Sequence, residues 1–324
     1  MKTTLYNFNE NNTAAFSIVI PTKNRPQALI DFLESLEKQS LQDSYSNFAV
    51  IIVDQSDAAM DKVFDDRFKT IPIIYCYDPS LDGGNAARIV GLKYASGKYT
   101  FIFDDDIVLT DNSLSDIMMK MDKFPEIMAM CFALKTNKTP SRLKKFITSL
   151  TKTGVFRVNR NDLPKELVSK YKKDRIVATY KLSGGACCYR SELFKEFSFS
   201  DELYSYCLGD DYDLSYRISK KYIVTRCYSL VIIHNHNQVG RFNHRKYCDS
   251  LICFYRWFYD KNIKKTFKNK LAYRLLIFGV WINALVNSCL TLSLAPFKGI
   301  LDGNKKIKNN YIGAYCIKSK EVLK

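Results

Sequence analysis

The chain has 324 residues, of which 47% are hydrophobic and 25% charged, a composition that excludes an intrinsically disordered protein. Its formal net charge is +16, yet this excess is local. Residues 135–175 hold 13 Lys and Arg against 3 Asp and Glu, and residues 241–324 hold 17 against 4, so the remaining segments sum to −7. We therefore expect an acidic body with two basic surfaces that meet phosphates or anionic lipid; solvated lysine-rich faces are the alternative.

Ten cysteines are scattered along the chain without a repeating framework. The first twelve residues are polar and lack the apolar run of a signal peptide. We therefore expect reduced cysteines that are buried as small hydrophobic residues, in a cytoplasmic protein.

The first hundred residues alternate between two kinds of apolar pattern. Short apolar runs predict strands at 16–21, 48–53, 71–76 and 99–103, and helical spacing predicts helices at 27–39 and 85–95. This alternation indicates βαβ units, hence an α/β fold with a mainly parallel central sheet flanked by helices. Ligands of such sheets bind outside the carboxyl ends of the strands, where Pro21, Asp54 and the triplet at 104–106 all fall.

The alternation breaks at residues 135–175, which we interpret as a basic insert. Regular patterns return at 180–189, in a helix at 211–221 and in a strand at 228–233 that runs into His234. From about residue 245 the chain is first aromatic and basic and then strongly apolar. We expect a catalytic domain over 1–245 and a helical tail over 246–324.

Three consecutive carboxylates, Asp104, Asp105 and Asp106, follow the predicted strand at 99–103. They repel one another unless a positive charge lies among them. Hard oxygen ligands of this kind suit Mg²⁺ or Mn²⁺ bound together with substrate phosphates. A solvated acidic turn that caps the next helix is the alternative.

A second acidic group, Asp210, Asp211 and Asp213, begins the helix predicted at 211–221. Acidic residues in a first helical turn are an ordinary capping device. The functional interpretation is that one carboxylate points into the cleft and deprotonates an acceptor hydroxyl. Asp213, beside Arg217, is expected to be structural.

Six segments occur in order and at fitting spacings over about residues 16–245: FSIVIPTKNRP, FAVIIVDQSD, GGNAARIVGLKYASGKYTFIFDDDI, LSGGACCYRSELF, LGDDYDLSYRI and IIHNH. Together they resemble family 2 of the GT-A glycosyltransferases. Asp210 departs from the family's usual Glu, and Ser229-Leu230 replaces a Pro often found before the last strand. Neither change removes a group that the chemistry needs.

The resemblance implies a GT-A fold and assigns roles to individual positions. The donor would be held by Pro21, Thr22, Arg25, Asp54, Asp82, Arg88, Asp104 and Asp105. A divalent metal, Mn²⁺ or Mg²⁺, would be held by Asp104, Asp106 and His234. Gly184, Gly185 and Asp210 would lie on the acceptor side, and Asp211 would be the general base. Residue-level alternatives are a helix-surface role for Arg88, a structural role for His234, and His236 as the histidine that reaches the site.

The activity implied by the resemblance is inverting transfer of a sugar from a UDP- or dTDP-sugar to a saccharide or lipid-linked saccharide, in cell-surface polysaccharide synthesis. A nucleotidyltransferase of similar fold is one alternative, but it should carry a Gly-rich basic loop where this chain has TKNRP. A non-catalytic binder of polyanions or saccharides is another, but it would have no reason to keep Asp104, Asp106 and Asp211 together. Nucleic acid is not an expected partner, because no binding motif is present.

Residues 275–295 are about long enough to cross a bilayer. They contain Asn283, Asn287, Ser288, Thr291 and Ser293, which disfavour a lone spanning helix. With the cationic stretch at 261–270, they predict an interfacial anchor at the inner face of the cell membrane. The alternative is a soluble helix that packs on the body or on a second copy.

Overall fold

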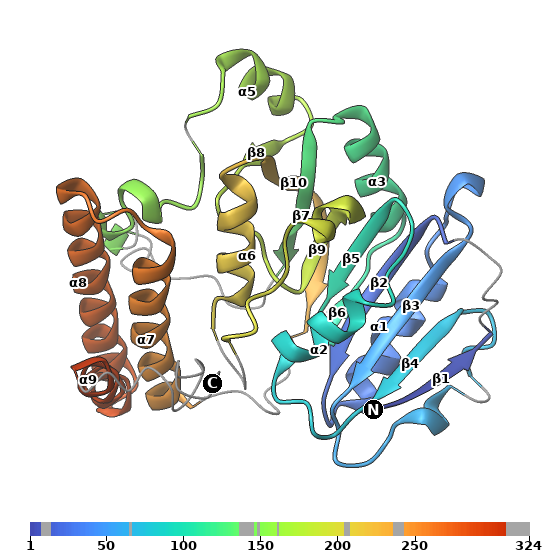
Figure 1. Ribbon diagram of the computed structural model, residues 1–324, viewed down its shortest axis with the longest axis horizontal. Helices are drawn as coiled ribbons and strands as arrows, with labels where there is room; N and C mark the ends of the chain where they lie inside the picture. Colours follow the sequence, from blue (N-terminus) through green and yellow to red (C-terminus); the bar gives the residue numbers. More distant parts are fainter. Residues whose placement is uncertain are drawn as a thin grey trace.

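The computed structural model describes residues 1–7, 14–64, 67–135, 146–147, 150–160, 162–203, 208–235 and 243–308. Their strands form one ten-stranded mixed sheet, with a group of helices beside it (Figure 1). The strands are β1 Lys2–Tyr6, β2 Phe16–Thr22, β3 Phe48–Asp54, β4 Ile73–Tyr77, β5 Tyr99–Phe103, β6 Ile107–Val108, β7 Ile127–Lys135, β8 Ile176–Ala178, β9 Ala186–Arg190 and β10 Ile223–His234.

The amino-terminal half of the sheet is parallel, in the order β4-β3-β2-β5. Every residue of β2 and β5 is buried, as expected for parallel strands that are covered on both faces. Helices α1 (Pro26–Glu37) and α3 (Ser113–Lys123) supply core residues on one face, while α2 (Gly84–Leu92) and α6 (Asp210–Ser219) supply them on the other. The predicted α/β sheet with flanking helices is confirmed.

The carboxy-terminal half of the sheet is mixed. Strand β9 lies antiparallel between β5 and β7, β10 runs parallel to β7, and the short strands β6 and β8 pair antiparallel with β10. The strand predicted at 228–233 is the second half of the longer β10, whose register with β7 shifts between Cys227 and Val231. The pattern at 180–189 becomes a strand only from Ala186, because the residues before it form a loop at the carboxyl edge of β5.

The predicted insert is described in part; residues 136–145, 148–149 and 161 lie outside the described residues. It includes the helical turn η3 (Gly154–Phe156) and helix α5 (Lys165–Lys172). Phe156 is buried against the rings of Phe258, Tyr259 and Tyr273. The insert therefore packs on the tail as well as on the sheet.

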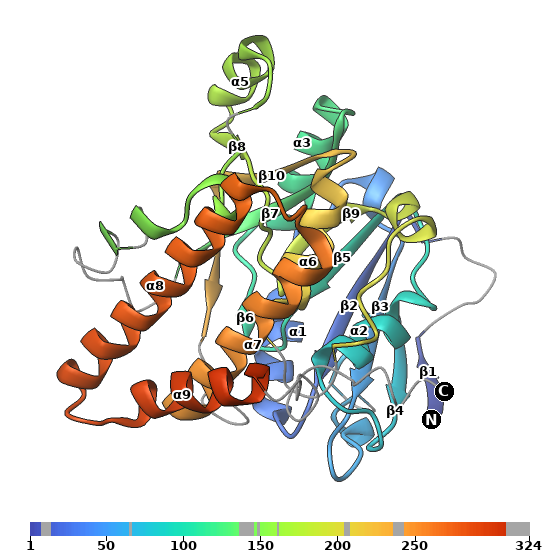
Figure 2. The same cartoon turned by 60° about the vertical axis from the view of Figure 1, so that its left-hand side comes forward.

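The tail consists of α7 (His244–Asn262), α8 (Phe267–Leu290) and α9 (Ala295–Lys308), which lie together to one side of the sheet (Figures 1 and 2). The side chains of Asn243 and Thr266 cap α7 and α8 by accepting backbone N–H groups. Aromatic rings join α7 to α6: Tyr212 stacks on Phe258 with ring centroids 4.7 Å apart. Helix α7 therefore shares a hydrophobic cluster with the helix that begins at Asp210.

Asp213 is fully buried and makes three contacts that join α6 to its surroundings. One carboxylate oxygen accepts hydrogen bonds from Ser200 Oγ (2.6 Å) and Arg217 Nε (2.9 Å), and the other accepts from Asn262 Nδ2 (2.8 Å) in the last turn of α7. This arrangement agrees with the structural role expected for Asp213.

Replacing Asp213 by alanine leaves these three donors without an acceptor and Arg217 without its charge partner. We expect Asp213→Ala to lower the free energy of unfolding by about 3–5 kcal/mol, measured by urea denaturation. The control is Asp162→Ala, which removes a half-exposed carboxylate paired with Arg160. This substitution should leave the urea midpoint nearly unchanged. Equal midpoints for Asp213→Ala and the wild type would contradict this role.

Candidate active site

A cavity of about 620 Å³ opens at the carboxyl ends of the parallel strands. Five segments contribute most of its lining: the end of β2 and the loop after it, the first turn of α2, the turn after β5, the loop before β9, and the first turn of α6. The predicted site residues among the lining are Pro21, Thr22, Arg25, Asp82, Arg88, Asp104, Asp105, Asp106, Gly184, Gly185, Asp210 and Asp211. The fold thus brings together residues that are up to 190 positions apart in the chain.

Asp54 is the predicted donor residue that the structure does not place in the lining. It is fully buried, and its carboxylate accepts hydrogen bonds from the backbone N–H groups of Ser56 (2.8 Å) and Met60 (3.1 Å) and from the hydroxyl of Tyr75 (2.5 Å). Burial and the hydrogen bond to Asp54 raise the pKa of Tyr75. Asp54 therefore holds the loop after β3, while its neighbour Gln55 lines the cavity and donates to the carbonyls of Leu81 and Gly83.

Asp105 connects the acidic turn to the loop after β2. Its two carboxylate oxygens accept hydrogen bonds from Thr22 Oγ1 and Arg25 Nη1, each 2.9 Å away. Burial raises the pKa of Asp105 to about 6, against the opposing effects of Arg25 and Thr22. The central carboxylate of the triplet thus orients Arg25 at the edge of the cavity.

Arg88 joins the two acidic groups. Its Nη2 lies 2.7 Å from Asp104 Oδ1, and its Nη1 lies 2.5 Å from Asp210 Oδ2. Burial disfavours the charge on Arg88, but Asp210, Asp104 and Asp211 outweigh that effect and raise its pKa. Burial in turn raises the pKa of Asp210, which Arg88 opposes. Because only 11% of its side chain is exposed, Arg88 is not a helix-surface arginine.

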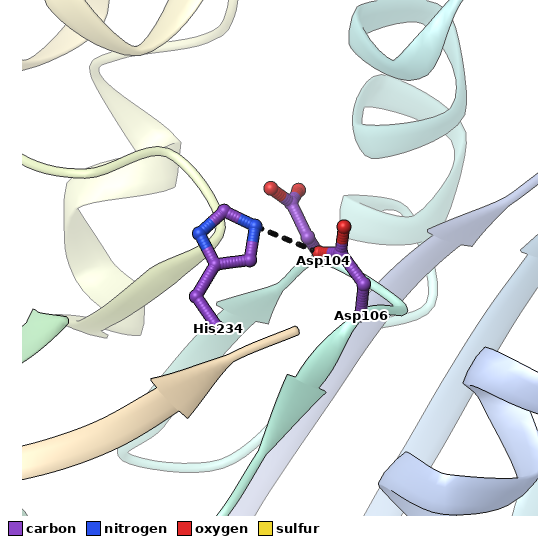
Figure 3. A group of neighbouring side chains, drawn as sticks. All are labelled: Asp104, Asp106 and His234. Atoms are coloured by element: carbon purple, nitrogen blue, oxygen red, sulfur yellow. Dashed lines mark ion pairs between the residues drawn. The ribbon is translucent and has the colours of Figure 1, made fainter. Parts of the chain in front are cut away.

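Asp104, Asp106 and His234 offer ligand atoms that all lie within 4.8 Å of one another. His234 is the last residue of β10, paired with Ile107 of β6, and its Nε2 lies 2.9 Å from Asp106 Oδ1 (Figure 3). Two carboxylate oxygens and an imidazole nitrogen form a donor set that fits Mn²⁺, with Mg²⁺ also served by the carboxylates. His236 lies outside the described residues.

Asp211 and the Gly184-Gly185 loop approach each other without intervening side chains. Asp211 Oδ2 accepts the N–H of Gly184 (3.1 Å), and its Oδ1 accepts the N–H of Tyr212 (2.8 Å). A Cβ added at Gly184 would lie 2.6 Å from Asp211 Cβ, and one added at Gly185 would lie 2.0 Å from Asp104 Cγ. Only glycine allows both carboxylates to sit this close to the loop.

Gly209 begins α6 with φ of 89°, in the left-handed region that favours glycine. A Cβ there would lie 2.3 Å from the ring of Phe254 on α7. The start of the helix that carries Asp210 and Asp211 therefore rests directly on the tail. Sequence reasoning missed Gly209 and the other lining residues Lys23, Asn24, Gln55, Gly83, Gly84, Asn85 and Leu208, although all of them adjoin the predicted motifs.

Comparison with known proteins places this site in a family. Residues 17–195 match the family model described as glycosyl transferase family 2. The chain belongs to this family. Membership decides against the nucleotidyltransferase alternative and agrees with the resemblance seen in the sequence.

Two bacterial glycosyltransferases are similar to this chain in sequence. Glycosyltransferase YwdF of Bacillus subtilis is 29% identical over 228 residues, which cover 69% of this chain and 75% of that protein. The amylovoran biosynthesis glycosyltransferase AmsB of Erwinia amylovora is 34% identical over 96 residues, or 28% of this chain. The matched region spans only 31% of AmsB.

Solved structures share the fold at low sequence identity. The mannosyltransferase PcManGT of Pyrobaculum calidifontis, in complex with GDP-Man and Mn²⁺, has a TM-score of 0.57 at 13% identity and covers 91% of this chain and 87% of its own. Residues 1–349 of S. aureus TarS, in complex with UDP-GlcNAc, have a TM-score of 0.52 at 13% identity and 91% coverage of both chains. In a longer TarS structure the matched part is 54% of that chain. These likenesses confirm the GT-A fold.

The close approach of Gly185 to Asp104 yields a test of the metal site. Gly185→Ala must displace the Asp104 carboxylate, so we expect Mn²⁺-dependent nucleotide binding to weaken about 10- to 100-fold in calorimetric titration. Gly84→Ala is the matched control, because a Cβ at Gly84 meets Arg88 only at an ordinary 3.6 Å. Unchanged Mn²⁺ dependence in Gly185→Ala would exclude Asp104 as a ligand.

Proposed function

We propose that the protein is an inverting glycosyltransferase that moves a sugar from a nucleoside diphosphate donor to a hydroxyl of a saccharide acceptor. The observation that carries this proposal is the placement of two acidic groups in one cavity. Asp104 and Asp106 lie with His234 at the turn after β5, and Asp211 lies at the start of α6, with Arg88 joining the two groups through Asp104 and Asp210.

The donor would occupy the side of the cavity formed by the loop after β2 and the turn after β5. A volume of about 620 Å³ is in the usual range for small-molecule sites. Arg25 and Lys23 bring positive charge to this side, and Thr22 and Asp105 hold Arg25 in place. We favour a UDP- or dTDP-sugar as the donor; structures of similar fold contain UDP-GlcNAc and GDP-Man.

A metal held by Asp104, Asp106 and His234 would stabilise the charge that develops on the departing diphosphate, as a Lewis acid does. The protein's own residues do the rest. Asp211 keeps its carboxylate oriented through the N–H groups of Gly184 and Tyr212 and accepts the proton of the acceptor hydroxyl. The hydroxyl oxygen then bonds to the anomeric carbon as the bond to the diphosphate breaks on the opposite face, which inverts that carbon.

We propose a saccharide or lipid-linked saccharide of cell-surface polysaccharide synthesis as the acceptor. The partial similarity to the amylovoran biosynthesis enzyme AmsB supports this class. The loop at Gly184 and Gly185, together with Asp210 and Asp211, forms the wall of the cavity opposite the loop after β2 and would face the acceptor. Because Gly209, directly before α6, packs against Phe254 of α7, an acceptor at this wall would lie between the catalytic body and the tail.

Calorimetric titration with UDP, dTDP, GDP and CMP, with and without Mn²⁺, tests donor binding. We expect one nucleotide to bind in a metal-dependent manner, because the carboxylates repel an anionic ligand until a cation is bound. Asp106→Ala should abolish the metal dependence, whereas Asp111→Ala, at an exposed carboxylate nearby, should preserve it. Folded wild-type protein that binds none of the four nucleotides would favour the non-catalytic alternative.

Asp211→Asn tests the base. The amide keeps the size of the carboxylate but cannot accept the proton, so we expect the rate of sugar transfer to fall by about 10²- to 10⁴-fold with donor affinity unchanged. The measurement is turnover with the donor identified by titration, with Asp111→Asn as the control. If donor affinity falls instead and turnover at saturation persists, Asp211 binds the donor and is not the base.

A further inference from the structure

The tail presents an apolar surface that nothing in the described part of the chain covers. Along α8, Leu271, Leu275, Phe278 and Leu285 recur at intervals of four, three and seven residues, so they share one side of the helix. Each is between 37% and 59% exposed. The surface continues through the corner between α8 and α9 in Leu290, Leu292 and Leu294. We call these seven residues the apolar edge.

Leu292, at the corner, is 93% exposed and has φ of 48°, in the left-handed region. That conformation is costly for a leucine and easy for glycine or asparagine. Neither the turn nor the packing of the residues that the structure describes gives a reason for a leucine here. Its apolar side chain, together with those of Leu290 and Leu294, is left uncovered by the described residues.

The opposite side of α8 is packed against protein. Ala272, Leu276 and Ser288 are buried, and a Cβ at Gly279 would lie 2.3 Å from Oγ1 of Thr151. The polar residues that disfavour a spanning helix lie on or near this packed side: Asn283 and Asn287 are half-buried. Residues 267–290 have the length and hydropathy to cross a bilayer, but a helix with one side packed on protein is suited to lie along a surface instead.

The stretch of chain that carries the apolar edge has only positively charged side chains. Residues 261–301 contain seven Lys and Arg and no Asp or Glu. Lys264, just before α8, and Lys268, Lys270 and Arg274, in its first two turns, are exposed, and none of them forms an ion pair with a residue that the structure describes. Positive charge beside exposed leucines matches an anionic lipid surface, whereas it would repel the same face of a second copy.

We propose that the apolar edge inserts into the headgroup region of an anionic bilayer, with the basic residues at the start of α8 on lipid phosphates. The inner face of the cell membrane offers such a surface. Figures 1 and 2 show α8 and α9 on the side of the molecule away from the parallel strands, with the α8–α9 corner projecting. If the proposed function holds, a lipid-linked acceptor would reach the cavity from this surface.

Co-sedimentation of the full chain with vesicles tests the proposal. We expect binding to vesicles of phosphatidylcholine with about one-third phosphatidylglycerol and weak binding to phosphatidylcholine alone. The triple variant Leu290→Ser, Leu292→Ser, Leu294→Ser should lower the partition coefficient at least about tenfold. Replacing Lys268, Lys270 and Arg274 by glutamine should lower it about 100-fold at low salt. Val168→Ser, at a 51% exposed residue of α5, is the matched control.

The depth to which the apolar edge inserts is measured with the variant Leu292→Trp. We expect brominated lipids to quench the fluorescence of this tryptophan. The proposal would be overturned if the wild-type protein did not bind anionic vesicles, or if the variants bound them as well as the wild type does. A dimer in light scattering that the leucine variant dissociates would also overturn it, since the edge would then be a subunit interface. Nucleotide titration of the same variants shows whether they are folded, because the apolar edge lies outside the cavity. Variants that bind nucleotide normally thus separate a failure of the membrane proposal from a failure of the proposed transferase activity.

Discussion

The ion pairs of Arg88 with Asp104 and Asp210 are the contacts on which the site depends. Asp210 is 122 residues from Arg88 in the chain, and Asp104 is 16 residues away, so one guanidinium joins the two halves of the catalytic body. Asp105, Asp106 and Asp211 lie in the same cavity, and Arg25 is the other arginine that lines it. The carboxylates that line the cavity outnumber the cations, so an anionic ligand would meet net negative charge there unless a cation is bound with it.

The sequence predicted the parallel strands and most of the cavity, because βα alternation alone places the carboxyl ends of the strands on one edge. It did not predict β1 or β7: β1 is a short exposed edge strand, and β7 is rich in Met, Ala and Cys, which favour no particular strand pattern. It also placed Asp54 in the cavity, where Gln55 lies. Asp54 is the last residue of β3 and Gln55 follows it, and the hydrogen bonds of Tyr75 and Met60 hold the Asp54 side chain away from the cavity.

The tail shows a different limit of sequence reasoning. The polar and apolar residues of α8 show no clear helical periodicity in the sequence. Its two sides become distinct only in the structure, where other segments pack on one of them. Thr151, from the predicted insert, and the helices α7 and α9 take up one side. Helix α9 can approach α7 closely because Gly299 and Gly303 of α9 face the backbone of α7. A Cβ at Gly299 would lie 2.1 Å from the carbonyl oxygen of Arg245.

The three glycines around the carboxylates of the cavity restrict how this enzyme can be re-engineered. Gly184 and Gly185 leave no room for a side chain beside Asp211 and Asp104, and Gly209 leaves none above Phe254. In a combinatorial library that randomises the whole cavity wall, most members would carry a side chain at one or more of these three positions, where only glycine fits. Lys23 and Leu208 also line the cavity and are not glycines held by such a close contact, so a small library focused on these two positions is the efficient route to altered sugar preference.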